Sequence, residues 1–295
     1  MTRELGVAGL QLMKYPDSEL NISRFEEIVS RTKARYPWVD LVFAGELLLQ
    51  KYGVKNWKDH AQPMPNDLTE RLAQLAKKNH CWLVPGSFLE KDGSKIYNTS
   101  VVFDPTGKLV AKYRKLFPWV PYEDTSFGSE FVMFEIPEVA KIGLTICYDV
   151  WFPEVYRTLA WMGAEVILQP SASYTPDRDA ELVLVQAQAI MNQCYVLNAN
   201  IIEPQGGGKS IFADPEGRII QQASTHEEIM IHALDIDKVS WVRDNGSYAL
   251  CAVWKAFRDS PLEGRFPPYK DLRSGAVFKG LKETKVQSSI REWKT

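Results

Sequence analysis

The sequence of 295 residues has few cysteines and few histidines, four of each, and their spacing excludes several kinds of site. Cys81, Cys147, Cys194 and Cys251 are far apart and form no Cys-x-x-Cys pair, so neither a zinc cluster nor a disulfide framework is predicted. Nothing in the settings of the histidines points to a Cys–His pair, although spacing alone leaves one open, and the chain has no Gly-x-Ser-x-Gly elbow. No metal site is therefore predicted, and no serine hydrolase site is indicated.

The chain also lacks a long apolar run and an excess of positive charge. No stretch of about 18 apolar residues occurs, and the N-terminal segment MTRELGVAGLQLMKYPDSE has no basic start followed by a long apolar stretch. The formal net charge is −2 and the isoelectric point is about 6.2, which provides no basic surface for a nucleic acid backbone. We therefore expect a soluble, cytoplasmic protein with no nucleic-acid or membrane partner.

What the chain does contain is an alternation of strand-like and helix-like segments, which is typical of an α/β protein. Hydrophobic residues make up 45% of the sequence, enough for a large core. The pattern predicts strands over residues 4–12, 41–49, 81–89, 142–146, 165–173 and 194–202. It predicts helices over residues 17–36, 67–80, 153–164 and 177–193, with Asp67 as the N-cap of the second helix.

Two Asp-Pro-x-Gly tetrads, residues 104–107 and 214–217, lie between apolar runs and predict hairpin turns. Each follows a strand-helix-strand-helix-strand series, so the two halves look like related copies, an internal pseudo-repeat. No Pro/Gly-rich linker separates them, and we predict one domain over residues 1–240 built around two sheets. Residues 241–295 lack sustained periodicity and are predicted to be a C-terminal extension. Packing on the domain or in oligomer contacts would suit its aromatic residues Trp254, Phe257, Phe266 and Tyr269.

Three reactive side chains lie beside apolar strands: Glu46 interrupts LVFAGELLL, Lys115 follows LVAKYR, and Cys147 ends IGLTI. A free cysteine is usually a small buried hydrophobe, and a buried Glu–Lys pair is usually a salt bridge, so structural roles fit each observation taken alone. Together the three groups suit acyl transfer. A carboxylate can take the thiol proton, a thiolate can attack a carbonyl carbon, and an ammonium can stabilise the oxyanion. The sequence thus predicts an acyl-transfer site without histidine.

Around these residues the chain resembles the nitrilase, or carbon–nitrogen hydrolase, superfamily. The matching motifs occur in order across most of residues 5–240: FAGEL, KYRKLFPW, ICYDVWFPE, the two Asp-Pro-x-Gly hairpins and the CYVLNAN strand. The resemblance implies a four-layer αββα sandwich with two mixed sheets. It also implies that the protein needs no metal or organic cofactor and forms homodimers or larger homo-oligomers.

The resemblance further implies roles for single residues. Cys147 is the expected nucleophile, Glu46 the general base and later acid, and Lys115 the oxyanion stabiliser, helped by the backbone N–H of Tyr148. Glu123, eight residues after the lysine, is expected to position substrate or water.

Two aromatic residues complete the expected site. Trp119 is an expected pocket wall, with a packed core aromatic as an equal alternative, and Tyr174 is an expected substrate contact. Near Tyr174, in SASYTPDRDAEL, Arg178 and Glu181 belong to a group of charges that could recognise the rest of a substrate. We favour a solvated helix start for that group, because acids are common in the first turn of a helix.

The sequence departs from the family pattern at a few positions. Gly45 stands where a proline usually precedes the glutamate, which loosens the local backbone and leaves the carboxylate in place. Gln188 and Met191 stand where many members carry arginine and glutamate, so the helical support of the site is expected to differ.

The residues around the cysteine indicate a branch of the family. Cys147-Tyr148-Asp149 followed by Pro153-Glu154 resembles amide hydrolases, whereas nitrilases typically have Cys-Trp-Glu, and KYRKLFPW resembles aliphatic amidases and formamidases. We therefore expect hydrolysis of a small primary amide to a carboxylic acid and ammonia through a thioester. Hydrolysis of an N-carbamoyl amine or amino acid, nitrile hydrolysis, and a catalytically silent scaffold stay open as alternatives.

Overall fold

The computed structural model describes residues 2–51, 56–202 and 204–261, and the strands in these ranges form two mixed sheets. The seven-stranded sheet has the order β13-β1-β2-β3-β5-β4, with β6 paired to β5. Its strands are β1 (Glu4–Gln11), β2 (Leu41–Ala44), β3 (Trp82–Val84), β4 (Phe88–Asp92), β5 (Lys95–Phe103), β6 (Leu109–Arg114) and β13 (Glu228–Asp235). The six-stranded sheet has the order β12-β11-β10-β9-β8-β7. Its strands are β7 (Met133–Ile136), β8 (Ala140–Leu144), β9 (Val166–Ser171), β10 (Tyr195–Asn200), β11 (Ile211–Ala213) and β12 (Ile219–Gln222).

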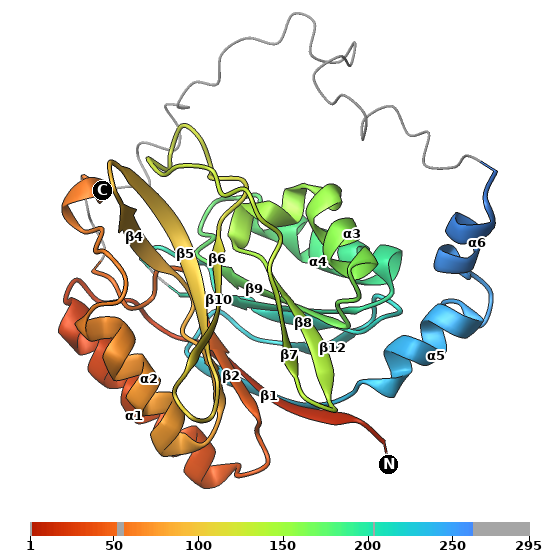
Figure 1. Ribbon diagram of the computed structural model, residues 1–295, viewed down its shortest axis with the longest axis horizontal. Helices are drawn as coiled ribbons and strands as arrows, with labels where there is room; N and C mark the ends of the chain where they lie inside the picture. Colours follow the sequence, from red (N-terminus) through yellow and green to blue (C-terminus); the bar gives the residue numbers. More distant parts are fainter. Residues whose placement is uncertain (1, 52–55, 203, 262–295) are drawn as a thin grey trace, which may run out of the picture.

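Helices cover the outer face of each sheet. The first pair is α1 (Ser18–Arg35) and α2 (Asp67–Asn79), and the second is α3 (Pro153–Trp161) and α4 (Arg178–Asn192). Figure 1 shows α1 and α2 outside the seven-stranded sheet and α3 and α4 outside the six-stranded sheet. The predicted αββα sandwich is confirmed, and α1 buries the expected apolar face, with Phe25 and Val29 fully buried. The predicted N-cap of α2 is wrong by one residue, because the side chain of Asn66 accepts the hydrogen bond from the N–H of Thr69.

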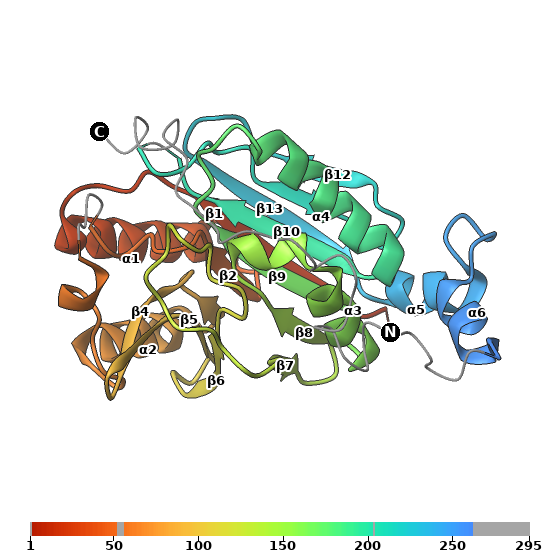
Figure 2. The same ribbon diagram turned by 90° about the horizontal axis from the view of Figure 1, so that it is seen from above.

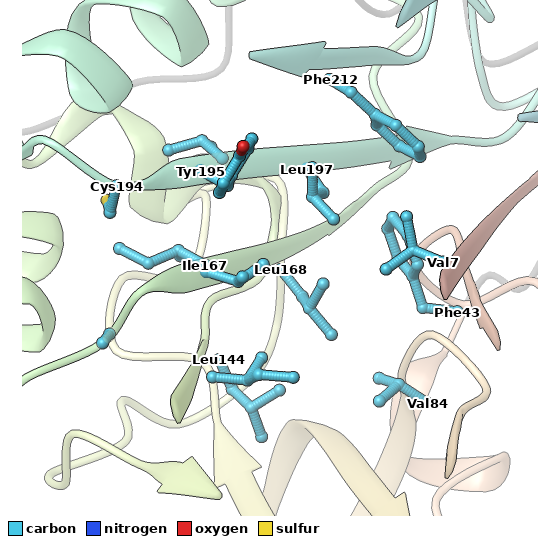
Figure 3. Close-up of a cluster of buried hydrophobic side chains, with 14 of the residues drawn as sticks. Val7, Phe43, Val84, Leu144, Ile167, Leu168, Cys194, Tyr195, Leu197 and Phe212 are labelled. Carbon is cyan, nitrogen blue, oxygen red and sulfur yellow. The ribbon is translucent and has the colours of Figure 1, made fainter. Parts of the chain in front are cut away.

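The main core lies between the two sheets. Figure 3 shows Val7, Phe43 and Val84 of the seven-stranded sheet facing Leu168 and Phe212 of the six-stranded sheet. The rings of Phe43 and Phe212 stack across the interface with their centroids 5.8 Å apart. Since helices cover the opposite faces, the central strands are buried on both sides, which explains their nearly continuous apolar sequence.

The two halves repeat the same order of elements, as predicted. Strands β1, β2 and β3 pair in parallel in one sheet, and β8, β9 and β10 pair in parallel in the other. The hairpins β5–β6 and β11–β12 turn at the two Asp-Pro-x-Gly tetrads, where Gly107 and Gly217 have positive φ angles of 87° and 76°. Two strand predictions differ most from the structure. Segment 41–49 leaves the sheet after Ala44, and segment 81–89 is broken into β3 and β4 around Gly86, which has a φ of 88°.

The end of the described chain forms α5 (Asp237–Asn245) and α6 (Val253–Asp259). Figure 2 shows both helices at the end of the molecule where the chain begins, and Arg3 forms an ion pair with Asp237 there. Trp254 of the predicted extension donates from its indole N–H to the carbonyl of Asn192, 3.1 Å away, so this part packs on the domain itself. Phe266 and Tyr269 lie outside the described residues, and assembly into homo-oligomers stays a prediction. Among the described helices, none combines the length and the apolar character that crossing a membrane requires.

Candidate active site

The chemically reactive residues lie just beyond the carboxyl ends of parallel strands in both sheets. Glu46 comes two residues after β2, and Cys147 comes three residues after β8. Lys14 and Ser173 occupy the corresponding positions after β1 and β9. The carboxyl ends of parallel strands are where α/β folds usually form ligand sites, because the connecting loops diverge there. The pseudo-repeat therefore brings residues from both halves of the chain to one place.

A cavity of about 930 Å³ opens at this place. That volume is near the top of the range of about 300–1,000 Å³ that is typical of ligand pockets. The structure brings together every residue that the sequence predicts for the site, because all of them line this cavity: Glu46, Lys115, Trp119, Glu123, Cys147, Tyr148 and Tyr174.

Glu46 lies in a turn after β2. The sequence pattern suggested that it interrupts a strand, and this prediction is wrong. Its backbone N–H donates to the carbonyl of Ser171, 3.1 Å away, and this bond ties the turn to the second sheet. The preceding residue, Gly45, packs so closely that an added Cβ would lie 2.6 Å from a side-chain carbon of Ile201. The close approach of the two sheets thus explains why glycine stands at this position.

Lys115 lies between two buried carboxylates. Its Nζ is 2.9 Å from Oε1 of Glu46 and 2.6 Å from Oε2 of Glu123, and all three side chains are at most 6% exposed. Burial alone would lower the pKa of Lys115, but the charges of Glu123 and Glu46 outweigh it and hold the pKa well above its usual range. The lysine stays charged, and the Glu46–Lys115 salt bridge considered from the sequence exists.

Asn98 of β5 joins the two carboxylates and was missed in the sequence. Its Nδ2 donates to Oε1 of Glu46 at 2.7 Å and to Oε1 of Glu123 at 3.0 Å. Oε2 of Glu123 also accepts from the backbone N–H of Trp119 at 2.8 Å. Both carboxylates are therefore fixed by several donors. The signal that could have identified Asn98 is an amide side chain within the strand-like run YNTSVVF, all of whose residues are buried in the structure.

Cys147 begins a short 3₁₀ helix, Cys147–Trp151, with a left-handed φ of 45°. Non-glycine residues rarely adopt this conformation, and it is common at functional sites. Sγ lies 3.5 Å from Oγ of Ser173, a polar contact that the sequence analysis missed. Burial and then the negative charge of Glu46 raise the pKa of the thiol well above its usual range, with a partial offset from Lys115. The resting thiol is therefore neutral and needs a base before it can attack.

Asp149 connects the cysteine turn to the segment that carries the lysine. Its Oδ2 accepts from the hydroxyl of Tyr113 at 2.6 Å and from the backbone N–H of Ile146 at 2.8 Å. Its Oδ1 accepts from the backbone N–H of Phe117 at 3.0 Å. Burial raises the pKa of Asp149 to about 6, against the lowering effect of these hydrogen bonds and of the Lys115 charge. Asp149 thereby links the turn that carries Cys147 to the segment that carries Lys115.

Replacing Asp149 with asparagine is expected to lower the free energy of unfolding by about 2–3 kcal/mol, because an amide nitrogen would face at least one buried N–H donor. The pKa of Asp149 is raised from 3.8 to about 6 on folding, so its protonated form favours the native state. The wild type should therefore lose a contribution to stability as the pH rises through about 6, and the variant should lack that step. Urea unfolding between pH 4 and 8 measures both effects. The exposed Asp179 changed to asparagine is the control, and equal curves for the two variants would contradict the assigned role.

The aromatic residues form the wall of the cavity. Trp119 is half-buried, lines the cavity and packs against Tyr122 in a tilted arrangement with ring centroids 4.2 Å apart, so its ring forms part of the cavity wall. Tyr148 packs edge-on against Phe152 at 5.4 Å. Burial raises the pKa of Tyr148 and of Tyr174, so both phenols are neutral at physiological pH.

The start of α4 corrects the expectation of a solvated helix start. Arg178 and Glu181 are each 4% exposed, and they form an ion pair of 3.0 Å. Arg178 also donates to Oδ1 of Asn198 at 2.6 Å, because the end of β10 and the loop before β11 cover this turn. Further along the helix, Gln188 donates to the carbonyl of Val150 at 3.1 Å and supports the 3₁₀ helix of the cysteine. The support that α4 gives to this turn therefore comes from a neutral amide, and its difference from the arginine and glutamate pattern stays a prediction.

The chain is similar to known proteins over most of its length. A family model described as carbon-nitrogen hydrolase matches residues 5–244. Omega-amidase NIT2 of Bos taurus is 32% identical over 219 residues, which cover 69% of this chain and 79% of that protein. Omega-amidase NIT2 of Xenopus tropicalis is 30% identical over 251 residues, or 80% of this chain and 90% of that protein.

Two solved structures have a fold similar to that of this chain. Nit3 of Saccharomyces cerevisiae, a member of branch 10 of the nitrilase superfamily, superposes with a TM-score of 0.76 at 30% identity. The match covers 82% of this chain and 94% of that chain. An amidase from Nesterenkonia sp. superposes with a TM-score of 0.71 at 21% identity, covering 81% of this chain and 94% of that chain. At 21% identity, the similarity to this amidase concerns the fold alone.

Proposed function

The chain belongs to the carbon–nitrogen hydrolase family, and from this premise we propose that it hydrolyses a primary amide to a carboxylic acid and ammonia, with Cys147 as the nucleophile. The resemblance seen in the sequence motifs is thereby confirmed. The observation that carries the proposal is the convergence of Glu46, Lys115 and Cys147 on one cavity, since these groups supply a base, an oxyanion donor and a nucleophile.

In the proposed first half-reaction, the Glu46 carboxylate takes the Sγ proton as Sγ attacks the amide carbon. The oxygen that becomes negative is held by the Lys115 ammonium and by the backbone N–H of Tyr148. An ammonium has three N–H donors, and Glu46 and Glu123 each accept one, so a third can point to the substrate. Glu46 then returns the proton to the amide nitrogen, the C–N bond breaks, ammonia leaves, and the acyl group stays on Cys147 as a thioester.

In the second half-reaction, Glu46 takes a proton from water, and the hydroxyl attacks the thioester carbon. The C–S bond breaks, the proton returns to Sγ, and the carboxylic acid leaves. Glu123 acts through Lys115, since Asn98, Trp119 and the lysine itself already donate to both of its oxygens. It is a positioning residue in this scheme.

The substrate is expected to be larger than the small aliphatic amide favoured by the sequence motifs. A cavity of about 930 Å³ far exceeds what formamide or acetamide would fill. The relatives at 30–32% identity are named omega-amidases, a name that denotes an amide at the end of a chain. We therefore propose a primary amide at the end of a longer substrate.

The test is ammonia release by the wild type over a panel of amides of increasing chain length, N-carbamoyl amines and amino acids, and simple nitriles. We expect ammonia from the primary amides, with kcat/KM rising with chain length. Ammonia from the N-carbamoyl compounds or the nitriles alone would move the assignment to that chemistry. Silence across the whole panel would contradict the proposal and favour the scaffold alternative.

A further inference from the structure

Ser173 lies two residues after β9 and lines the cavity, and the two half-reactions leave it without a role. Its Oγ is 3.5 Å from Sγ of Cys147, and either atom of this pair can be the donor. Ser173 is only 5% exposed, so bulk water does not compete for this contact. The sulfur that becomes negative during the reaction therefore already has a hydroxyl beside it.

The backbone of Ser173 is fixed by hydrogen bonds on both sides. Its N–H donates to Oδ1 of Asn200 at 2.9 Å, and its carbonyl accepts from Nδ2 of the same side chain at 2.9 Å. The carbonyl also accepts from the backbone N–H of Gly207 at 2.7 Å. Asn200 is fully buried, so this clamp is itself held in place. The hydroxyl is therefore presented to Sγ by a rigid backbone and needs only to rotate, which is the arrangement expected of a preorganised donor.

The hydroxyl of Ser173 has a second, anionic neighbour. Glu181 of α4 is 4% exposed, lines the same cavity and pairs with Arg178 at 3.0 Å. Burial raises the pKa of Glu181, and the charge of Arg178 and a hydrogen bond from Ser173 oppose this rise only in part. In the resting enzyme the thiol of Cys147 can thus donate to Oγ while the hydroxyl proton points to Glu181.

The charges that act on Cys147 come from three parts of the fold. Glu46 follows β2, Lys115 follows β6, and Glu181 belongs to α4. Glu46 loses its charge when it takes the thiol proton, but the charge of Glu181 still opposes a thiolate, and Lys115 already contacts two carboxylates. A hydrogen bond to a charged sulfur is about twice as strong as one to a neutral group, so a neutral donor is worth most after the proton has left.

We propose that the hydroxyl of Ser173 is a further catalytic group, which turns from Glu181 and donates to the Cys147 thiolate when Glu46 takes the Sγ proton. The inference rests on the proposed function in taking Cys147 as the nucleophile. The S–H bond breaks, the proton goes to the Glu46 carboxylate, and the electron pair stays on sulfur. Ser173 keeps its own proton throughout and only rotates. The same donor stabilises Sγ again as the leaving group when the C–S bond of the thioester breaks.

The reaction of Cys147 with methyl methanethiosulfonate tests the proposal, because this small neutral reagent carries no amide and reacts with a thiolate. In Ser173→Ala the pH profile of the rate constant between pH 6 and 10 should move up by about one to two units, the effect of losing a hydrogen bond to a charged group. At pH 8 the rate constant should fall about 3- to 10-fold, since a more basic thiolate is also more nucleophilic. Peptide mass spectrometry without reductant assigns the adduct to Cys147. The control is Ser240→Ala, at an exposed position of α5, which should stay within about 2-fold of the wild type.

Glu181→Gln distinguishes a specific donor from general damage to the buried cluster. This change removes a competing acceptor and a negative charge that raises the pKa of the thiol. The rate constant at pH 8 should therefore rise about 2- to 5-fold, the opposite direction from Ser173→Ala. A fall of similar size in both variants would show that any break in the cluster slows the thiol, and it would overturn the role of the hydroxyl.

Amide kinetics separate this inference from the proposed function. Ser173→Ala should lower kcat about 10-fold and change KM by less than about 3-fold. A raised KM with unchanged kcat and unchanged thiol reactivity would assign Ser173 to substrate binding and overturn the proposal. If the wild type hydrolyses no amide, the proposed function fails, yet the thiosulfonate profiles still decide on Ser173. A profile that Ser173→Ala moves to higher pH supports the hydroxyl as the thiolate donor, and an unmoved profile overturns it.

Discussion

Changing Cys147 to alanine is expected to abolish ammonia release from every amide that the wild type hydrolyses, with a loss of at least about 10,000-fold in kcat. The reason is that no other described cysteine lines the cavity, so nothing in the described residues can replace the thiolate. Alanine at position 147 has the same cost as cysteine of adopting a left-handed φ angle. The side-chain contact with Ser173 that is lost is a weak one. The free energy of unfolding should therefore change by less than about 1 kcal/mol.

The control is Cys251→Ser, because Cys251 is exposed and should leave kcat unchanged. A second measurement tests the thioester itself. Amide turnover in the presence of hydroxylamine should yield the hydroxamate with the wild type and none with Cys147→Ala, since hydroxylamine intercepts an acyl-enzyme. Residual turnover above about 1% in a folded Cys147→Ala protein would contradict the assignment of the nucleophile.

The sequence predicted the site well where strand ends carry the chemistry. Cys147 ends an apolar run that becomes the parallel strand β8, whereas Glu46, predicted inside the run 41–49, follows the shorter strand β2. The carboxyl ends of these parallel strands meet in this fold. The Asp-Pro-x-Gly turns were equally predictable, because a four-residue turn depends on local backbone preferences. These features could be read because each depends on residues that are near one another in the chain.

Other parts of the site depend on contacts between distant residues, and the sequence alone could not show them. Asn98 meets Glu46 across 52 positions, and Lys14 meets Gln205 across 191 positions. The start of α4 carries charges that resemble a solvated helix start, yet Arg178 is covered by the carbonyl of Gly208 and by Asn198. Strand β13 was also missed, because its pairing with β1 spans most of the chain. Periodicity shows which face of a helix or strand is apolar, but it does not show which residues cover the polar face.

Changing Lys115 to methionine is expected to lower kcat at least about 100- to 1,000-fold, the usual cost of losing one oxyanion donor. The structure adds a consequence for stability. Without the ammonium, Glu46 and Glu123 would lie buried beside Asn98, and none of the described residues would contact them as a counter-ion. Breaking a buried ion pair by removing one partner typically costs about 3–5 kcal/mol, so the variant should also unfold at lower urea concentration.

A second change separates these two effects. In Lys115→Met combined with Glu123→Gln, one of the two uncompensated carboxylates is neutral, so part of the lost free energy of unfolding should return. The kcat should stay low, because the oxyanion donor is still missing. If Lys115 served only as the counter-ion of a structural salt bridge, the double variant would regain activity together with stability. Steady-state kinetics and urea unfolding of the wild type, both single variants and the double variant therefore distinguish a catalytic lysine from a structural one.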